Sequence, residues 1–506
     1  MARFTLKGMF SRRTVVSTAE STSSMGAELL DLNPDAEDGS PVVSQRIEPR
    51  ILSYDYSATQ RKLIFGICAT SLFMASIDQT IVAAVLPRIG DAMNSRLNWT
   101  GWIVTIYAVG QIIAMPLAGK ISDQFGRKQV FLYCIALFTV SSLACGLATN
   151  IYMLILFRFV QALGGGGFMP CAAGIIADSF GSNRDRAIGM FSSIFPIGQI
   201  AGPVFGGLIT EYWIWRGVFF VNVPIGIGLL FLAVRYIPKA ATRERSRFDM
   251  AGVGLLTMTI VSGMLAISSL GENGVSIVDV RFLLPFVVAV VLGWLLMRHE
   301  HRTSTPLIPP RLINGKGFRT MNLLNLLFGA ALLGFATLAP IYAENRYHIA
   351  ISEAGTVMSA RALGTLIIAA AATMLLRRTG YRLPMTIGFL TTAVAFIMIA
   401  VSPWGISAYW WIALFSLLAG LGLGCAAPAS NNAVLQLAPH DIGAIIGLRG
   451  MFRQIGGIAY VAIATTVIAR SAHPGLAQAH IFIIQAFVLV LMVGLVYTVP
   501  DHRGSW

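Results

Sequence analysis

Charged residues are scarce in this chain of 506 residues, of which 12% are Asp, Glu, Lys or Arg and 56% are hydrophobic. Soluble globular domains carry about 25% charged residues, so the composition excludes an ordinary soluble protein. With a mean hydropathy of +0.71, it predicts a protein embedded in the lipid bilayer. The net charge of +14 does not indicate a nucleic-acid partner, because the basic residues lie in short loops between apolar runs.

Cysteine is rare as well. The five cysteines fall within apolar runs and form no C-x-x-C pair, which argues against disulfides and against a metal site. The chain has no G-x-x-x-x-G-K-[ST] phosphate loop, so it is not a self-contained ATP-driven pump. It also lacks an H-E-x-x-H pattern, and its seven histidines lie in loops or at the ends of apolar runs. These absences argue against a membrane-embedded enzyme, and no cofactor is expected.

Long apolar runs fill the rest of the chain. From about residue 63 to residue 499, runs of roughly 20 residues follow one another, each long enough to cross a hydrocarbon core of ~30 Å. About fourteen spans are predicted, and they begin near Leu63, Trp99, Gln129, Ile151, Ala187, Arg216, Met250, Phe282, Thr320, Ala354, Leu383, Ala408, Gly443 and His480. Lys and Arg are about three times as numerous in one set of alternate loops as in the other, which places both termini in the cytoplasm. The predicted fold class is an all-α polytopic membrane protein.

An internal repeat divides these spans into two halves. An offset of 258 residues relates glycines and prolines of the fourth span to those of the twelfth, in the pairs Gly164 and Gly422, Gly166 and Gly424, and Pro170 and Pro428. Isoleucines and glycines of the fifth and thirteenth spans match at the same offset. The repeat predicts two six-helix bundles, residues 62–238 and 319–506, separated by a two-helix insert at 239–318. Residues 1–61 are polar and predict a disordered cytoplasmic tail.

A glycine-rich stretch, G-Q-I-A-G-P-V-F-G-G, lies inside one apolar run. Gly198, Gly202 and Gly206 recur every four residues, so they share one helix face that a neighbouring helix can approach closely. Pro203 removes a backbone donor and is expected to bend this helix, and Gly207 ends the stretch. The pattern fits a surface that slides or rocks, and a static packing seam is the alternative.

The first loop predicted to face the cytoplasm reads G-K-I-S-D-Q-F-G-R-K, from Gly119 to Lys128. Asp123 beside Arg127 and Lys128 predicts a charge cluster at the helix ends, and Gly126 permits the tight turn. The positive-inside rule explains the cations in this loop but not the acid or the two glycines.

At these residues the sequence resembles the major facilitator superfamily, whose loop signature is G-x-x-x-D-x-x-G-R-K and whose antiporter motif resembles the stretch from Gly198 to Gly207. Two further stretches are similar to fourteen-helix drug:proton antiporters of the EmrB/QacA type. They are S-I-D-Q-T-I-V-A-A-V-L-P from Ser76 and W-I-W-R-G-V-F-F-V-N-V-P-I-G from Trp213. The resemblance implies the major facilitator fold, with two additional central helices. It departs at Ala162, where the motif R-x-x-Q-G-x-G usually has Gly.

Asp78 and Arg158 are the residues predicted to couple transport to protons. At ~1.5 Å per residue, Asp78 lies about 14 Å below the outer end of its span, and Arg158 lies about 10 Å below Ile151. Ionisable residues in hydrocarbon normally face a partner, so nearly equal depths predict a pair. Protonation of Asp78 would then free Arg158 and change the favoured conformation. A static ion pair between the two helices is the alternative.

Other intramembrane polar residues are candidates for the substrate cavity: Gln161, Arg361, Arg453 and Glu344. Arg449 shares a face with Arg453, but it is interpreted as snorkelling toward the cytoplasmic end. The two deeper arginines favour neutral, zwitterionic or weakly acidic amphipathic substrates over divalent cations. Glu344, at the outer end of its span, fits either the mouth of the cavity or an ordinary interfacial acid.

The leading functional hypothesis is a proton-coupled exporter of small amphipathic compounds in the cell membrane, working by alternating access without a cofactor. Protons, the substrate and the lipid bilayer are its expected partners. A nutrient symporter on the same fold and a membrane receptor or scaffold that does not transport are the alternatives. The sequence leaves open whether a periplasmic adaptor and an outer-membrane channel continue the path.

Overall fold

The computed structural model describes residues 56–95, 97–238, 249–270, 275–304, 306–315, 317–349, 351–435, 437, 441–499 and 501. Of the predicted tail at 1–61, residues 1–55 lie outside the described residues. The first helix, α1 (Ala58–Ala92), begins earlier than the predicted span. Ser57 and Gln60 form a capping box there, in which each side chain bonds to the other's backbone N–H.

All regular elements of the described residues are helices, and twelve helical segments are long and apolar enough to cross a membrane. These segments are α1, α2 (Leu97–Phe125), α3 (Arg127–Gly146), α4 (Ile151–Phe180), α7 with α8 (Gly217–Phe220 and Asn222–Tyr236), α9 (Met250–Leu270), α10 (Val280–Arg302), α12 (Phe318–Tyr347), α14 (Arg382–Ala400), α15 (Ala408–Leu435), α16 (Ile442–Ala469) and α17 (Pro474–Val496). Two further helices, α6 (Ile194–Tyr212) and α13 (Ile351–Thr379), pack against α1 and α15 respectively. The short elements are η1 (Gly181–Asn183), α5 (Arg184–Ser192) and α11 (Pro310–Asn314).

Two helix breaks in the last third of the first half follow from prolines. Pro196 and Pro224 have no N–H to donate to the carbonyls of Ser192 and Phe220, four residues earlier. The chain accordingly breaks between α5 and α6, and again between α7 and α8. The second break begins α8 at Asn222, a residue that contributes to the site described below.

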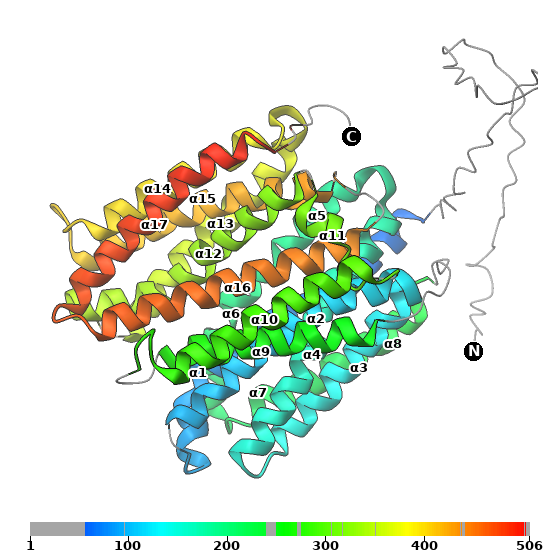
Figure 1. The fold of residues 1–506 in the computed structure, drawn as a ribbon, viewed down its shortest axis with the longest axis horizontal. Coiled ribbons are helices and arrows are strands. Elements are labelled where there is room, and N and C mark those ends of the chain that lie inside the picture. Colours follow the sequence, from blue (N-terminus) through cyan, green and yellow to red (C-terminus); the bar gives the residue numbers. More distant parts are fainter. Residues whose placement is uncertain are drawn as a thin grey trace, which may run out of the picture. The chain divides into compact units, whose positions relative to one another are not determined.

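Two glycines related by the predicted repeat pack in equivalent ways. Helix α4 lies against α2 and α3, and α15 lies against α13 and α14. Gly164 faces the backbone of α3 and Gly422 faces the backbone of α14, so the related positions contact the related helices. Figure 1 shows α12, α13, α14, α15 and α17 together on one side of the bundle and α1, α3, α4, α7 and α8 on the other.

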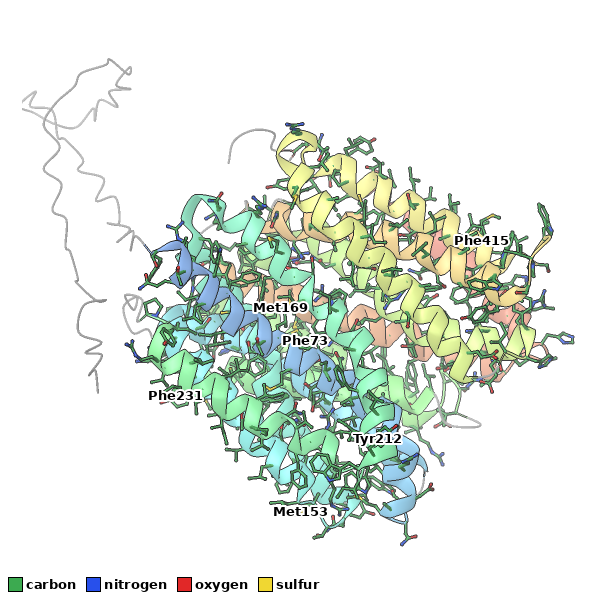
Figure 2. The ribbon with its side chains drawn as sticks, turned by 180° about the vertical axis from the view of Figure 1, so that it is seen from behind. Phe73, Met153, Met169, Tyr212, Phe231 and Phe415 are labelled. Atoms are coloured by element: carbon green, nitrogen blue, oxygen red, sulfur yellow. The ribbon has the colours of Figure 1, made fainter. Side chains whose placement is uncertain are left out.

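Helices α9 and α10 pack against each other, and α9 also contacts α2 and α16 (Figure 1). Only 6% of the residues in the most apolar window of α10 are buried, so this helix lies at the outside of the bundle. Phe231 of α8 is likewise directed away from the bundle: its side chain points outward in Figure 2 and is 72% exposed. Apolar side chains facing outward are expected where the surrounding solvent is hydrocarbon.

Substitution of Gly422 by Ala is expected to destabilise the second half. A Cβ at this position would lie 2.6 Å from the carbonyl oxygen of Gly388 and would also meet the hydroxyl of Thr392, so α14 and α15 must separate. Overpacking of this kind costs about 1–3 kcal/mol, and it should lower the Tm of the purified protein. Gly228→Ala is the matched control, because no atom lies within 4 Å of its Cβ position. An equal Tm for the two variants would contradict the close contact.

Candidate functional site

The predicted pair of Asp78 and Arg158 is present in the structure. Arg158 Nη1 of α4 lies 2.6 Å from Asp78 Oδ2 of α1, and the two side chains are 1% and 0% exposed. The nearly equal depths calculated from helical rise therefore correspond to a direct contact. An ion pair in this apolar setting is stable only if good geometry and further hydrogen bonds offset the loss of hydration.

Neutral side chains supply those further hydrogen bonds. Gln161 Nε2 donates to Asp78 Oδ1 at 3.0 Å and to the hydroxyl oxygen of Ser142 at 2.6 Å, and its Oε1 accepts from Arg158 Nη1 at 2.7 Å. Asn222 Nδ2 of α8 donates to Asp78 Oδ1 at 2.8 Å. Side chains of α1, α4 and α8 thus meet at one carboxylate, and Ser142 of α3 joins them through Gln161. We call Asp78, Arg158, Gln161, Ser142 and Asn222 the Asp78 cluster.

Aromatic rings enclose the guanidinium of Arg158. Its Cζ lies 4.0 Å from the centroid of the Tyr107 ring of α2 and 5.7 Å from that of Phe219 of α7. A cation over a ring face is attracted to it, most strongly where water is excluded. The aromatic contacts and the ion pair together hold the guanidinium in place.

Sequence reasoning identified Asp78, Arg158 and Gln161 but not Asn222, Ser142 or Tyr107. Asn222 lies within the stretch from Trp213 to Gly226 that carries part of the family resemblance, so its polar side chain in an apolar run was a usable signal. Ser142 and Tyr107 carried no such signal, because each is an ordinary residue of a membrane helix.

The stretch from Gly119 to Lys128 was predicted as a loop, but it consists of the last turns of α2, Gly126 and the start of α3. The predicted pair of Asp123 and Arg127 is present in it. Gly126 has φ +102° and connects α2 to α3. Arg127 binds Asp123 Oδ1 at 3.1 Å and Asp178 Oδ1 at 2.6 Å, so it ties this stretch to the end of α4. Lys128 Nζ donates to the carbonyl of Val234, so this stretch is also bonded to α8.

The same stretch touches the second half of the chain. Asp123 Oδ2 accepts a hydrogen bond of 3.3 Å from the backbone N–H of Ala444, in the first turn of α16. The free N–H groups and dipole of a helix start favour a negative charge there. A Cβ on Gly119 would meet the carbonyl of Gly443, so the two backbones are in close contact.

The contact between α2 and α16 continues toward the middle of both helices. A Cβ on Gly447 would meet the carbonyl of Met115, and Gln454 Nε2 donates to Gln111 Oε1 at 2.8 Å in a buried bond. We call this line of contacts, from Asp123 to Gln454, the α2–α16 seam. Gln111 is one helical turn from Tyr107, so the seam ends beside the Asp78 cluster.

The glycine face of α6 packs against α1, the helix that carries Asp78. A Cβ on Gly198 would come within 2.6 Å of Ser76 Cβ, and one on Gly202 would meet the hydroxyl of Thr80. Gly206 is buried, and the surroundings of Pro203 and Gly207 lie outside the part of the chain that the structure describes. Close approach is therefore present, whereas sliding of α6 stays a prediction.

A cavity of about 20 Å³ lies between the two halves. Its lining residues come from α4, α5, α12, α15 and α16, and they are Met169, Ala173, Ile188, Ser192, Asn325, Asn431, Leu435, Ile446, Arg449, Gly450 and Arg453. Met169 is labelled in Figure 2, on the side of α4 that faces the second half.

Of the predicted cavity residues, Arg453 lines this cavity and the other three do not. Gln161 belongs to the Asp78 cluster. Arg361 of α13 is buried elsewhere and bonds to the carbonyl of Leu332 at 3.4 Å, and Glu344 is exposed in the last turns of α12. Arg449 is 7% exposed and does not snorkel, because its guanidinium binds carbonyl oxygens of α15 instead of reaching the surface.

Comparison with known proteins gives one family, two relatives and one solved structure. Residues 68–461 match the family model described as Major Facilitator Superfamily. The chain is 27% identical to "Multidrug resistance protein 3" of Bacillus subtilis (strain 168) over 419 residues, covering 81% of this chain and 80% of that protein. It is 29% identical to the "Tetracenomycin C resistance and export protein" of Streptomyces glaucescens over 401 residues, covering 77% and 72%. The solved structure of the proton:xylose symporter XylE matches with a TM-score of 0.62 at 15% identity, covering 89% of this chain and 98% of that one, a likeness of fold alone.

Proposed function

Because the chain belongs to the Major Facilitator Superfamily, we propose that it is a proton-coupled exporter that moves small amphipathic compounds out of the cytoplasm by alternating access. The protein is an integral, multi-pass membrane transporter and not an enzyme. The names of two relatives, which denote multidrug resistance and the export of one compound, support transport in the outward direction. The motifs at Ser76 and Trp213 support a finer assignment to the drug:proton antiporters of the EmrB/QacA type.

In the proposed architecture, α6 and α13 complete a set of fourteen spans. Their lengths of 19 and 29 residues suffice to cross the hydrocarbon core. The bundles are then residues 62–238 and 319–506, α9 and α10 form the insert at 239–318, and both termini face the cytoplasm. The stretch from Gly119 to Lys128 and the start of α16 accordingly lie at the cytoplasmic end.

The observation that carries the proposal is the complete burial of Asp78 against Arg158. A carboxylate with 0% exposure exchanges protons with water only after the surrounding helices move. Its protonation removes the partner charge of Arg158, so the neutral and ionised clusters favour different packing of α1 against α4. Proton uptake and conformational change are thereby linked at one residue.

The Asp78 cluster is connected to the interface between the halves through side chains of α2. Arg158 stacks on Tyr107 of α2, and Gln111, one turn further along α2, binds Gln454 of α16. A shift of Arg158 upon protonation of Asp78 would therefore act on the helix that forms the α2–α16 seam. Opening and closing of this seam is the proposed rocking step.

Transport in inverted membrane vesicles tests the proposal. With an acidic interior, a set of fluorescent amphipathic compounds of either charge should accumulate in vesicles that contain the protein, and a protonophore should abolish the accumulation. Vesicles without the protein are the control. Release of compounds from the vesicles under the same gradient would indicate the symporter alternative, and the absence of movement in either direction would favour a receptor or scaffold.

A further inference from the structure

The cavity between the halves carries positive charge without a negative counterpart. Arg449 and Arg453 both line it, whereas none of its eleven lining residues is Asp or Glu. The buried carboxylate of Asp78 is already bound to Arg158 in the first half. Burying a cation without an anion is costly in an apolar environment, so the arrangement favours a negative ligand.

Arg449 is held rigidly by neutral acceptors. Its Nη1 donates to the carbonyls of Ser430 at 2.7 Å and Asn431 at 2.9 Å. Its Nη2 donates to Asn325 Oδ1 at 2.9 Å and to the hydroxyl of Ser430 at 3.1 Å, and its Nε donates to Asn325 at 3.3 Å. These bonds satisfy the donors of the guanidinium but leave its charge in place.

Arg453 lies one turn further along α16, on the same helix face, and has no such acceptors. Its nearest polar contact in the described residues is Nη2 to the Sδ of Met169, at 4.0 Å. Thioether sulfur is a weak acceptor, so the guanidinium keeps its donors available. The planar fork of Arg matches carboxylate, sulfonate and phosphate groups.

Five apolar side chains line the cavity beside the two cations, together with the neutral polar residues Ser192, Asn325 and Asn431. Met169, Ala173 and Ile188 come from the first half, and Leu435 and Ile446 come from the second half. A volume of about 20 Å³ accommodates roughly one water molecule. In this conformation the cavity therefore offers only a subsite for a small group, and an apolar body enters when the halves separate.

We propose that Arg453, with the charge of Arg449 behind it, binds the anionic group of the exported compound, and that the substrates are amphipathic organic monoanions. This assignment rests on the proposed export function and narrows its substrate class. Met169 contacts Arg453 across the interface between the halves, so an anion bound here also lies where the rocking motion takes place.

Ligand-induced thermal stabilisation of the full-length protein in a non-ionic detergent tests the inference. The probes are the monoanion 8-anilinonaphthalene-1-sulfonate, the monocation rhodamine 6G, inorganic phosphate and dihexanoyl phosphatidylglycerol. The sulfonate should raise the Tm and the monocation should not. Arg453→Gln should weaken sulfonate binding about 10- to 100-fold, and Arg453→Lys should restore part of it, because a charge-assisted hydrogen bond is lost in the first variant and replaced in the second.

Arg298→Gln is the matched control, since Arg298 is exposed on α10 and does not line the cavity. Stronger stabilisation by rhodamine 6G, or unchanged sulfonate binding in Arg453→Gln, would overturn the inference. Stabilisation by phosphate alone would identify a site for free anions, and stabilisation by the phosphatidylglycerol alone would identify a lipid site, so either result would also overturn it. These are binding measurements, and they stand whether or not the vesicle experiment supports proton-driven export.

Discussion

Asp78→Asn is expected to abolish substrate accumulation driven by a pH gradient while the protein stays folded. The amide has nearly the shape of the carboxylic acid, but it cannot bind and release a proton, so the cluster is fixed in its neutral form. A gradient of two pH units supplies about 2.7 kcal/mol for each exchanged proton. That free energy supports an accumulation ratio of about 100, and the ratio in the variant should fall to roughly 1.

Transport measurements in inverted vesicles would establish this effect, with the Tm and the elution volume of the purified variant as checks of folding. Asp91→Asn is the matched control, because Asp91 lies on the same helix and is exposed. Exchange of substrate at equal pH on both sides should persist in Asp78→Asn, since it requires rocking but no proton transfer. Normal accumulation by this variant would remove Asp78 from the mechanism and leave the pair as a static link between α1 and α4.

Gly447→Leu is expected to block transport for a different reason. A Cβ on Gly447 would meet the carbonyl of Met115 and lie 3.0 Å from Pro116 Cα, so a larger side chain prevents closure of the α2–α16 seam. The contact lies between the halves, and the packing inside each half is unaffected. We expect at least about a tenfold loss of transport rate, which corresponds to 1.4 kcal/mol of destabilisation of the closed state, with a Tm close to that of the unmodified protein.

A distance measurement would separate this effect from general damage. Spin labels at Gln129 on α3 and Arg378 on α13 occupy exposed positions in the two halves, and they should move apart in Gly447→Leu. Gly66→Leu is the control, because no atom lies within 4 Å of its Cβ position. An unchanged label distance together with normal transport would show that the seam need not close. Gly422→Ala is expected to lower the Tm, whereas Gly447→Leu is expected to lower the transport rate at nearly unchanged Tm. This difference distinguishes a glycine packed inside one half from a glycine packed between the halves.

The main elements of the site were accessible from the sequence because they depend on position along a helix. Depth in the membrane follows from residue number and helical rise, so the pairing of Asp78 with Arg158 was predictable before any tertiary structure. The turn at Gly126 and the charge pair of Asp123 and Arg127 are also local, since they span only a few residues. The offset of 258 residues predicted the packing of α4 and α15 because equivalent glycines need equivalent close contacts.

Other features depend on the rotation of each helix about its axis and on which helices become neighbours. The bond from Ala444 to Asp123 joins residues 321 positions apart, and no local pattern indicates it. The carbonyls that hold Arg449 belong to α15, so an arginine interpreted as snorkelling is instead a fixed charge. Arg361 and Glu344 have suitable depth or chemistry for the cavity, but their helices direct them elsewhere.

By itself the sequence determined that this chain is a helical membrane protein, because hydrocarbon requires long apolar helices with internally satisfied backbones. It also predicted which helices repeat and at what depth the charges lie. Only the tertiary structure decided that Asn222 completes the Asp78 cluster, that α2 meets α16, and that Arg453 faces a cavity without an acid. Helix rotation and neighbour choice are settled by the packing of side chains from distant parts of the chain, and that packing is a property of the whole bundle.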